Sequence, residues 1–419
     1  MLQYGSGARM APIATLREEE MTASEMSMRR GLRARTLIAL GALAGVAAMF
    51  AGLAAEAEAK GKSRGGKTVK VMTRNVFLGA DLGPALEATT LAGAIDASGE
   101  ILNDVDASNF PERAKALAKE IKQNKPHLIG LQEVALWRDQ TPSDLGAPPT
   151  GIGAPATNVR YDFLQLLLDR LKKRGAKYKV ADSKTEFDAE LPADTDGSDA
   201  TGGFAGADLD GRLTMRDVIL ERKTKRLKVK KPDNASYDAL LGVSVGGIPL
   251  TVVRGWQQVE ATLKPKKGKA STAGKRGGNA KFRFVNTHLE AFDASVRESQ
   301  AKELIADGGP ADTKKQVILV GDLNSGLPKH EVFGEDQLAF KALKQFGFKD
   351  RGTVHSCCVS DLISSPPSEF DHTVDHVLTN PGLRKLSAKI VGEEKKDKTK
   401  KSGLWPSDHA GVVSKLKLK

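Results

Sequence analysis

Short apolar runs that end in polar residues recur along the chain. Residues 68–75 alternate between apolar and polar side chains, whereas 127–133 and 316–325 contain almost continuous apolar runs. Alternation is typical of a strand with one buried face, and a short continuous run is typical of a strand buried on both faces. We therefore predict a strand at each of these three places, ending where the polar side chains begin.

Helical spacing separates the predicted strands. The segment 109–125 begins with a capping Asn109, repeats apolar residues at helical intervals and stops before Pro126. A leucine-rich helix is expected at 161–174, followed by Gly175 as its stop signal. Further helices are expected at 296–305 and 336–346, and further strands at 216–220, 240–245, 248–253, 256–263, 281–287, 373–378, 388–391 and 411–418.

Two long segments, 138–159 and 182–211, are rich in Gly, Pro or acidic residues and are predicted to be loops. The many strands and few helices predict an α/β (α+β) fold. We expect a four-layer sandwich, in which two packed, mostly antiparallel mixed β-sheets are flanked by helices.

The N-terminal region has the three parts of a secretory signal. Four arginines at 29–35 precede an apolar stretch at 37–55, and an Ala-Glu-Ala sequence follows at 57–59. We predict a signal peptide or a retained signal anchor within 1–59, a basic linker at 60–66 and a catalytic domain at 67–419. The location is then secreted or extracytoplasmic, with no stable membrane span unless the signal is retained.

The composition of the chain says more about its binding partners than about its fold. The chain has 419 residues and a net charge of +12, and its first 59 residues contain six basic and six acidic side chains. The remainder is therefore strongly basic, which favours anionic partners such as nucleic acid or phosphate esters. The two cysteines, Cys357 and Cys358, are adjacent, so they indicate neither a disulfide framework nor a zinc finger. A buried pair and a bridge between neighbours are the alternatives.

Polar residues at the predicted strand ends form a candidate site. Open α/β sheets place ligands where strands stop. Carboxylate and amide oxygens without a dense Cys or His cluster suit a hard cation, Mg²⁺ or Mn²⁺, and argue against zinc. The candidate residues are Asn75, Glu133, His288, Asp322, Asn324, Asp375, Asp408 and His409.

The motifs containing these residues resemble those of the endonuclease/exonuclease/phosphatase superfamily, the fold of pancreatic deoxyribonuclease, neutral sphingomyelinases and inositol polyphosphate phosphatases. They occur in the family's order over about residues 67–419: Thr73-Arg-Asn75, Leu131-Gln-Glu133, Asn286-Thr-His288, Gly321-Asp-Leu-Asn324, Val374-Asp-His376 and Ser407-Asp-His409.

The resemblance implies a role for each strand-end residue. Glu133, with Asn75 and Asp408 near it, would hold the divalent ion. Asp322 would polarise the attacking water, while Asn324 would orient that water or the phosphate.

On the same basis, His409 paired with Asp375 would stabilise the transition state or protonate the leaving group. His288 would face the phosphate from the other side, with Asp217 as the candidate acidic partner of this histidine.

Strand direction sorts the remaining basic residues. Arg254 begins a strand antiparallel to that of His288, so it is expected to lie beside His288 and to grip a phosphate oxygen. The lysine-rich segment 264–281 joins the far ends of these strands and should lie about 20 Å away. The lysines of 393–401 would line the mouth of the site and Trp405 would stack on a base or touch lipid, unless this loop is merely solvated.

We therefore expect an exported, monomeric, Mg²⁺- or Mn²⁺-dependent hydrolase of phosphodiester bonds, with nucleic acid the favoured substrate. The alternatives are a sphingomyelinase-like phospholipid phosphodiesterase, an inositol phosphate phosphatase and a catalytically silent binding module on the same fold.

Overall fold

Two mixed β-sheets and the helices on their outer faces make up the part of the chain that the computed structural model describes: residues 67–144, 155–197, 206–265, 278–326, 337–352 and 355–419. The predicted signal region 1–59, the linker 60–66 and most of the lysine-rich segment 264–281 lie outside these residues. Within them, no helix combines the length and the apolar character needed to cross a membrane.

The first sheet has the strand order β15-β16-β1-β2-β6-β3-β4, with β5 paired to β6. Its strands are β1 (Thr68–Asn75), β2 (Leu128–Gln132), β3 (Leu136–Gln140), β4 (Asn158–Asp162), β5 (Tyr178–Ala193), β6 (Leu209–Arg222), β15 (Arg384–Val391) and β16 (Gly411–Lys417). Strands β1 and β2 are parallel, and the other neighbours are antiparallel.

The second sheet has the order β13-β14-β12-β11-β10-β7, and β8 and β9 form a separate hairpin. These strands are β7 (Leu227–Ser236), β8 (Leu241–Val245), β9 (Ile248–Val252), β10 (Gly255–Leu263), β11 (Ala280–His288), β12 (Gln316–Asp322), β13 (Lys349–Asp350) and β14 (Asp375–Thr379). Only β11 and β12 are parallel in the described part of this sheet.

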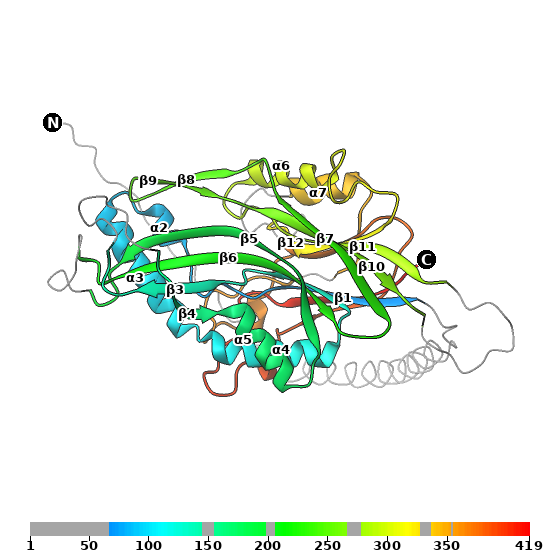
Figure 1. The fold of residues 1–419 in the computed structure, drawn as a ribbon, viewed down its shortest axis with the longest axis horizontal. Helices are drawn as coiled ribbons and strands as arrows, with labels where there is room; N and C mark the ends of the chain where they lie inside the picture. The colour runs from blue at the N-terminus through cyan, green and yellow to red at the C-terminus, as the bar shows by residue number, and fades with distance from the viewer. Residues whose placement is uncertain (1–66, 145–154, 198–205, 266–277, 327–336, 353–354) are drawn as a thin grey trace, which may run out of the picture. The chain divides into compact units, whose positions relative to one another are not determined.

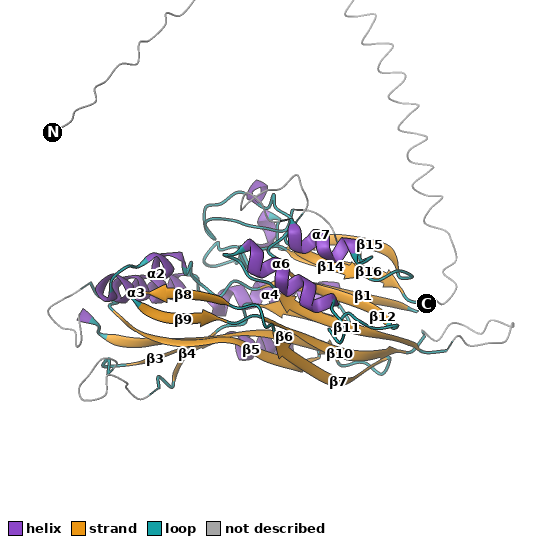
Figure 2. Ribbon diagram, turned by 90° about the horizontal axis from the view of Figure 1, so that it is seen from above, coloured by secondary structure: helices purple, strands orange, loops and turns teal. Residues whose placement is uncertain are grey.

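Helices cover the outer face of each sheet, as Figures 1 and 2 show. The helices are α2 (Gly83–Glu87), α3 (Leu91–Ala107), α4 (Phe110–Asn124), α5 (Phe163–Lys173), α6 (Ala294–Ile305) and α7 (Leu338–Gln345). Helices α3, α4 and α5 pack on the first sheet, and α6 and α7 pack on the second. The expected four-layer α/β sandwich with mostly antiparallel mixed sheets is therefore confirmed.

The space between the sheets is filled by apolar side chains and crossed by one polar network. Val71 and Leu128 of the first sheet meet Phe284 of the second in this central core. The buried Gln132 Nε2 donates to Asn286 Oδ1 across the sheets at 2.7 Å. A buried polar pair that is fully bonded aligns the two sheets in one register, since a shift would leave its donors unpaired.

The segment 182–211 was expected to be a loop, and this expectation is wrong for its described parts. Residues 182–193 belong entirely to β5, and β6 begins at Leu209. The acidic side chains that suggested a loop are paired across strands: Arg212 holds Asp188 at 2.8 Å. Such cross-strand pairs stabilise a solvated ribbon whose strands lack continuous apolar runs. The segment 138–159 likewise includes the ends of β3 and β4.

Candidate active site

One row of residues across the second sheet supplies half of the candidate site. His288 at the end of β11 pairs in register with Asp322 at the end of the parallel β12. Asp322 in turn pairs with Asp375, the first residue of the antiparallel β14. The register therefore brings together three residues that are up to 87 positions apart in the sequence.

The first sheet supplies the other half at the same rim. Asn75 ends β1, and Glu133 directly follows the parallel β2, whose Gln132 is in register with Asn75. Asp408 and His409 precede β16, which pairs with β1 on its other side. The hydroxyl of Ser407 donates to the Asn75 carbonyl at 2.9 Å and fixes this segment against the end of β1.

Glu133 leaves its strand in an unusual backbone conformation. Its φ of +58° lies in the left-handed region, which side chains other than Gly, Asn and Asp rarely adopt. Such a conformation costs on the order of 1–3 kcal/mol and occurs mostly at functional sites. Here it accompanies a carboxylate whose Oε2 accepts from the Leu78 amide at 2.8 Å and whose Oε1 accepts from Asn75 Nδ2 at 2.7 Å.

Asp322 lies at the centre of the constellation. Its Oδ2 accepts from Asn75 Nδ2 at 3.1 Å, and its Oδ1 accepts from the Asn324 amide at 2.9 Å. The same Oδ2 lies 3.6 Å from His409 Nε2 and 3.7 Å from His288 Nε2. A carboxylate with an imidazole on each side can accept a proton from a water molecule. A second group that can donate a proton then lies close to the same water.

His409 is oriented by Asp375. Its Nδ1 lies 2.8 Å from Asp375 Oδ2, and both side chains are buried. Burial by itself would lower the pKa of His409, but the charges of Asp375, Asp408 and Asp322 outweigh it and raise this pKa well above its usual value. The surrounding carboxylates therefore favour the protonated form of His409, which is suited to stabilise negative charge on a phosphate oxygen or to donate a proton.

His288 has the opposite character. Burial and the nearby Arg254 lower the pKa of His288 to about 3, so its ring is neutral. Arg254 Nη1 lies 3.0 Å from His288 Nδ1, and because a guanidinium only donates, this nitrogen must be the acceptor. The side-chain Nδ2 of Asn324 lies 3.2 Å from His288 Nε2. The surroundings of the two histidines thus shift their pKa values in opposite directions.

Arg254 lies beside His288, as its strand position predicts, but the expected partnership of His288 with Asp217 is wrong. The guanidinium of Arg254, and not the Asp217 carboxylate, lies at Nδ1 of His288. Asp217 lies in a buried ionic group behind the site, where burial and Glu186 raise the pKa of its carboxyl well above its usual value. Glu290, which the sequence did not single out, lies 3.7 Å from Arg254 Nε. The only sequence signal for it was its place two residues after His288.

The residues expected to hold a cation include carboxylates whose negative charges lie close together. Burial and then the neighbouring Asp408 raise the pKa of Glu133. Burial also raises the pKa of Asp408, with a smaller contribution in the same direction from Asp322. Two partly buried carboxylates beside the amide of Asn75 match the all-oxygen donors that Mg²⁺ and Mn²⁺ prefer. The donor set of this chain therefore fits a hard divalent ion.

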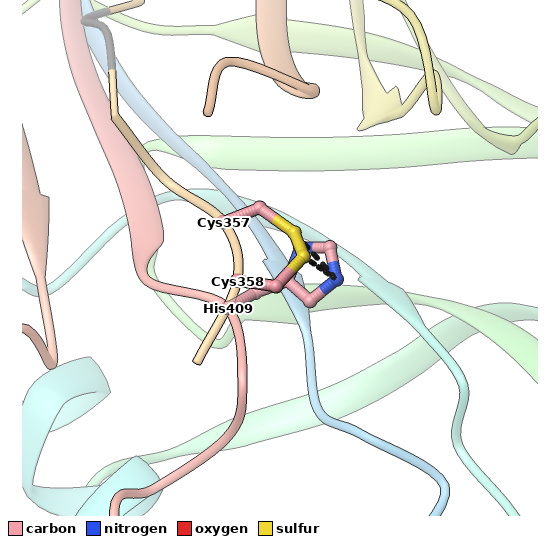
Figure 3. Close-up of side chains that lie close together, drawn as sticks. All are labelled: Cys357, Cys358 and His409. Atoms are coloured by element: carbon pink, nitrogen blue, oxygen red, sulfur yellow. Dashed lines mark hydrogen bonds between the residues drawn. A yellow bond between two sulfur atoms is a disulfide. The ribbon is translucent and has the colours of Figure 1, made fainter. Parts of the chain in front are cut away.

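A disulfide between Cys357 and Cys358 lies against His409, a relationship that the sequence did not reveal. The two Sγ atoms are 3.6 Å and 3.8 Å from His409 Nε2. Figure 3 shows both sulfurs directed at the imidazole ring. Of the two alternatives that the sequence left open, the structure has the bridge between neighbours.

Trp405 was expected to stack on substrate, and its position contradicts this. The indole is fully buried, packs edge-on to Phe370, and donates from Nε1 to the Ser365 carbonyl at 2.9 Å. The apolar residues around it hold the loop before β16 in place. Lys398, in the loop 393–401, lies 4.6 Å from the centre of the Trp405 ring and covers the indole.

Two packed sheets flanked by helices, with carboxylate, amide and imidazole groups converging at one rim, define a class of α/β phosphoester hydrolases. The chain belongs to the Endonuclease/Exonuclease/phosphatase family, whose model matches residues 97–409. Members of this family are in general phosphoester hydrolases that use a divalent metal ion. The resemblance drawn from the sequence motifs is therefore confirmed.

Several solved structures of low sequence identity match most of this chain. An endonuclease/exonuclease/phosphatase from Bacteroides vulgatus is 16% identical over 84% of this chain and 99% of its own, with a TM-score of 0.46. A mannosyl-6-phosphatase of Bacteroides thetaiotaomicron is 15% identical over 83% and 99%, with a TM-score of 0.46. Truncated TDP2 of Caenorhabditis elegans is 18% identical over 84% and 97%, with a TM-score of 0.41. No curated protein matches the chain.

Proposed function

We propose that this protein is an exported hydrolase of phosphodiester bonds that requires a divalent metal ion, Mg²⁺ or Mn²⁺. The observation that carries the proposal is the position of Asp322 Oδ2, within 3.7 Å of both His288 and His409 and bonded to the Asn75 amide. Hydrolysis of a phosphodiester needs a positioned water, a proton acceptor and donors around the phosphate oxygens, and these side chains are suited to each task.

Glu133, Asp408 and the amide oxygen of Asn75 would hold the ion, which when bound supplies positive charge to a phosphate oxygen. Asp322 accepts a proton from the attacking water, and Asn324, two residues further along the chain, orients that water or the phosphate.

His409, held as an imidazolium by Asp375, stabilises the charge that develops on the phosphate and donates a proton to the leaving oxygen. The neutral His288, held in one tautomer by Arg254, faces the phosphate from the other side as a hydrogen-bond donor.

The test is hydrolysis of bis-p-nitrophenyl phosphate by the purified full chain. Activity is expected with Mg²⁺ or Mn²⁺, to stop on addition of EDTA and to return when the metal is restored. A preparation of the His409→Ala variant, made in the same way, controls for a contaminating phosphatase. Activity that survives complete chelation, or that is equal in the variant, would refute the proposal.

Nucleic acid is a second candidate substrate because of the net charge of +12. One further observation favours it: Lys398, in the loop 393–401, donates to the carbonyl of Ile363, which lines the cavity at the site. Cations at such a rim could follow a phosphate backbone. Cleavage of plasmid DNA and RNA, with its dependence on salt, tests this candidate; binding that does not weaken as salt rises would exclude it.

Export rests on the N-terminal sequence, in which the basic residues, the apolar stretch at 37–55 and Ala57-Glu-Ala59 follow one another. Expression with a periplasmic or secretory host and sequencing of the mature N-terminus tests it. A mature chain that begins at Lys60 is expected. An uncut chain in the membrane fraction would instead support the signal anchor.

A further inference from the structure

A cavity of about 640 Å³ opens directly from the candidate catalytic residues. Glu133, His288, Asp322, Asp408 and His409 line one end of it. Much of the rest of its lining is apolar and comes from α2–α3, the β5–β6 ribbon and the β8–β9 hairpin. Apolar side chains of these elements that line it include Leu86, Ile101, Leu191, Leu213, Leu250 and Val252. We call the part of the cavity between these three elements the side chamber.

The walls of the side chamber are held in place by the packing of the fold. The β8–β9 hairpin is fastened to the end of α2, because the amide of Gly246 donates at 3.0 Å to the carbonyl of Ala88, the C-cap residue of that helix. Gly246 has a φ of +57°, and a Cβ at this position would lie 2.7 Å from that of Ala94. A larger residue would therefore push the hairpin off the helix and open the chamber wall. Figures 1 and 2 both show this hairpin beside α2 and α3, at the end of the long β5–β6 ribbon.

Charge in the cavity is unevenly distributed. Among the described residues that line it, Arg254 is the only arginine and there is no lysine. Asp81, Asp104 and Asp361 lie on the lining outside the catalytic end, and all three are exposed. A polyanion such as nucleic acid needs cations along its path. The side chamber offers apolar surface in their place, so it suits a neutral and apolar ligand group.

Two exposed apolar side chains also belong to the lining of the cavity. Phe292 and Ile363 are 56% and 59% exposed. Apolar side chains that line a concave site of this size are typical of small-molecule sites, where a few polar groups fix the orientation of a mainly apolar ligand. Here the polar groups are those suited to phosphoester chemistry, and they are continuous with the apolar walls.

We infer that the side chamber binds a hydrocarbon substituent of the phosphoester substrate, so that the substrate class is a phosphoester with an alkyl or acyl chain. The inference rests on the proposed phosphoesterase function, because the catalytic residues at the end of the chamber orient the phosphate. Transfer of the chain from water to the apolar walls supplies binding free energy that grows with chain length. This substrate class differs from nucleic acid, which presents sugars and charged phosphates to the protein.

The test compares p-nitrophenyl methyl phosphate with p-nitrophenyl octyl phosphate, the latter below its critical micelle concentration, as substrates of the full chain with Mg²⁺. We expect kcat/KM to be at least about 30-fold higher for the octyl ester. This factor is well below the effect expected for complete burial of seven methylene groups. In the Leu250→Gln variant, which places an amide in the wall of the side chamber, this ratio should fall at least about fivefold. Thr251→Gln, on the exposed side of the same strand, should keep the wild-type ratio.

A binding measurement separates the chamber from the chemistry. Calorimetry with octylphosphonate and methylphosphonate is expected to give tighter binding of the octyl compound by at least about tenfold in wild type, and a smaller difference in Leu250→Gln. Chain-length-independent hydrolysis together with equal phosphonate affinities would overturn the chamber proposal and leave the phosphoesterase function intact. Selective binding of octylphosphonate without hydrolysis of either ester would support the chamber and refute the proposed function.

Discussion

Asp375 Oδ2 and His409 Nδ1 form a 2.8 Å hydrogen bond, although Asp375 belongs to the second sheet and His409 precedes a strand of the first. The bond joins the two halves of the site and makes the charge of His409 depend on Asp375. A buried carboxylate in this position fixes the tautomer of the imidazole and stabilises its protonated form.

The Asp375→Asn substitution should therefore reduce kcat by on the order of 10²-fold or more, with the fold retained. Because the carboxylate raises the pKa of His409, its loss should also move the alkaline limb of the kcat/KM profile to lower pH. Hydrolysis of bis-p-nitrophenyl phosphate across pH 5–10 with saturating Mg²⁺ measures both effects. The matched control is Asp350→Asn, since Asp350 faces the ring of His376 at 3.4 Å. Equal rates in both variants would remove Asp375 from the chemistry.

The Glu133→Gln substitution tests the proposed cation site. Loss of one carboxylate among Glu133, Asp408 and Asn75 weakens attraction for a divalent ion, so the Mg²⁺ concentration for half-maximal activity should rise by on the order of tenfold or more. Titration of activity with Mg²⁺ in metal-stripped enzyme gives this value. Glu87→Gln, an exposed position at the end of α2, serves as the control. An unchanged midpoint in Glu133→Gln would place the ion elsewhere.

Reduction of the bridge between Cys357 and Cys358 should lower the activity severalfold. Reduction leaves two thiols beside His409 Nε2, and a thiolate formed there would pair with the imidazolium and compete with the phosphate for it. Tris(2-carboxyethyl)phosphine in the presence of excess Mg²⁺ is the reagent, with hydrolysis rate and thiol content followed together. The Cys357→Ser/Cys358→Ser double variant should not respond to the phosphine. Full activity after two thiols have been released would show that the bridge does not affect His409.

The strand ends of the site were predictable because apolar runs fix where buried strands stop. β1 was expected at 68–75 and is Thr68–Asn75, and the segment 127–133 contains β2, Leu128–Gln132. Strand direction also placed Arg254 beside His288, since Gly255 is in register with His288. These inferences needed only local pattern and chain direction.

Other features depended on contacts that no local pattern carries. Helix α3 was not predicted, because its interior contains Gly93 and Gly99, both weak helix formers. A Cβ at Gly99 would lie 1.5 Å from the Asp194 carbonyl oxygen, so this glycine allows α3 to pack closely on β5. Tertiary packing outweighed propensity there, and the same packing creates the side chamber.

Trp405 was assigned to the site because it is close to His409 in the sequence. The backbone turns between Trp405 and His409, so the indole enters a small apolar cluster while the imidazole faces the rim. Neighbours in a loop can point in opposite directions, and only the three-dimensional path of the loop decides which of them meets substrate.

His127 provides a test of stability that is separate from catalysis. Its Nδ1 accepts from the Lys70 amide at 3.0 Å, and its Nε2 is buried without a hydrogen-bond partner among the described residues. Burial, with smaller effects of Arg222 and Arg226, lowers the pKa of His127 to about 4. The unfolded chain binds this proton near pH 6.5 and the folded chain only near pH 4. The contribution to stability is therefore complete above pH 6.5 and is lost as pH falls toward 4.

We expect the free energy of unfolding to fall by up to about 3 kcal/mol from this group between pH 7 and pH 4. His127→Asn keeps an acceptor near the Lys70 amide but cannot be protonated, so the variant should lose less stability than wild type over that range. Urea unfolding at pH 7, 6, 5 and 4.5 measures the difference, and His355→Asn, at a partly buried histidine outside the first sheet, is the control. If His127→Asn and His355→Asn both follow the wild-type curve, burial of His127 has no part in the acid sensitivity of the fold.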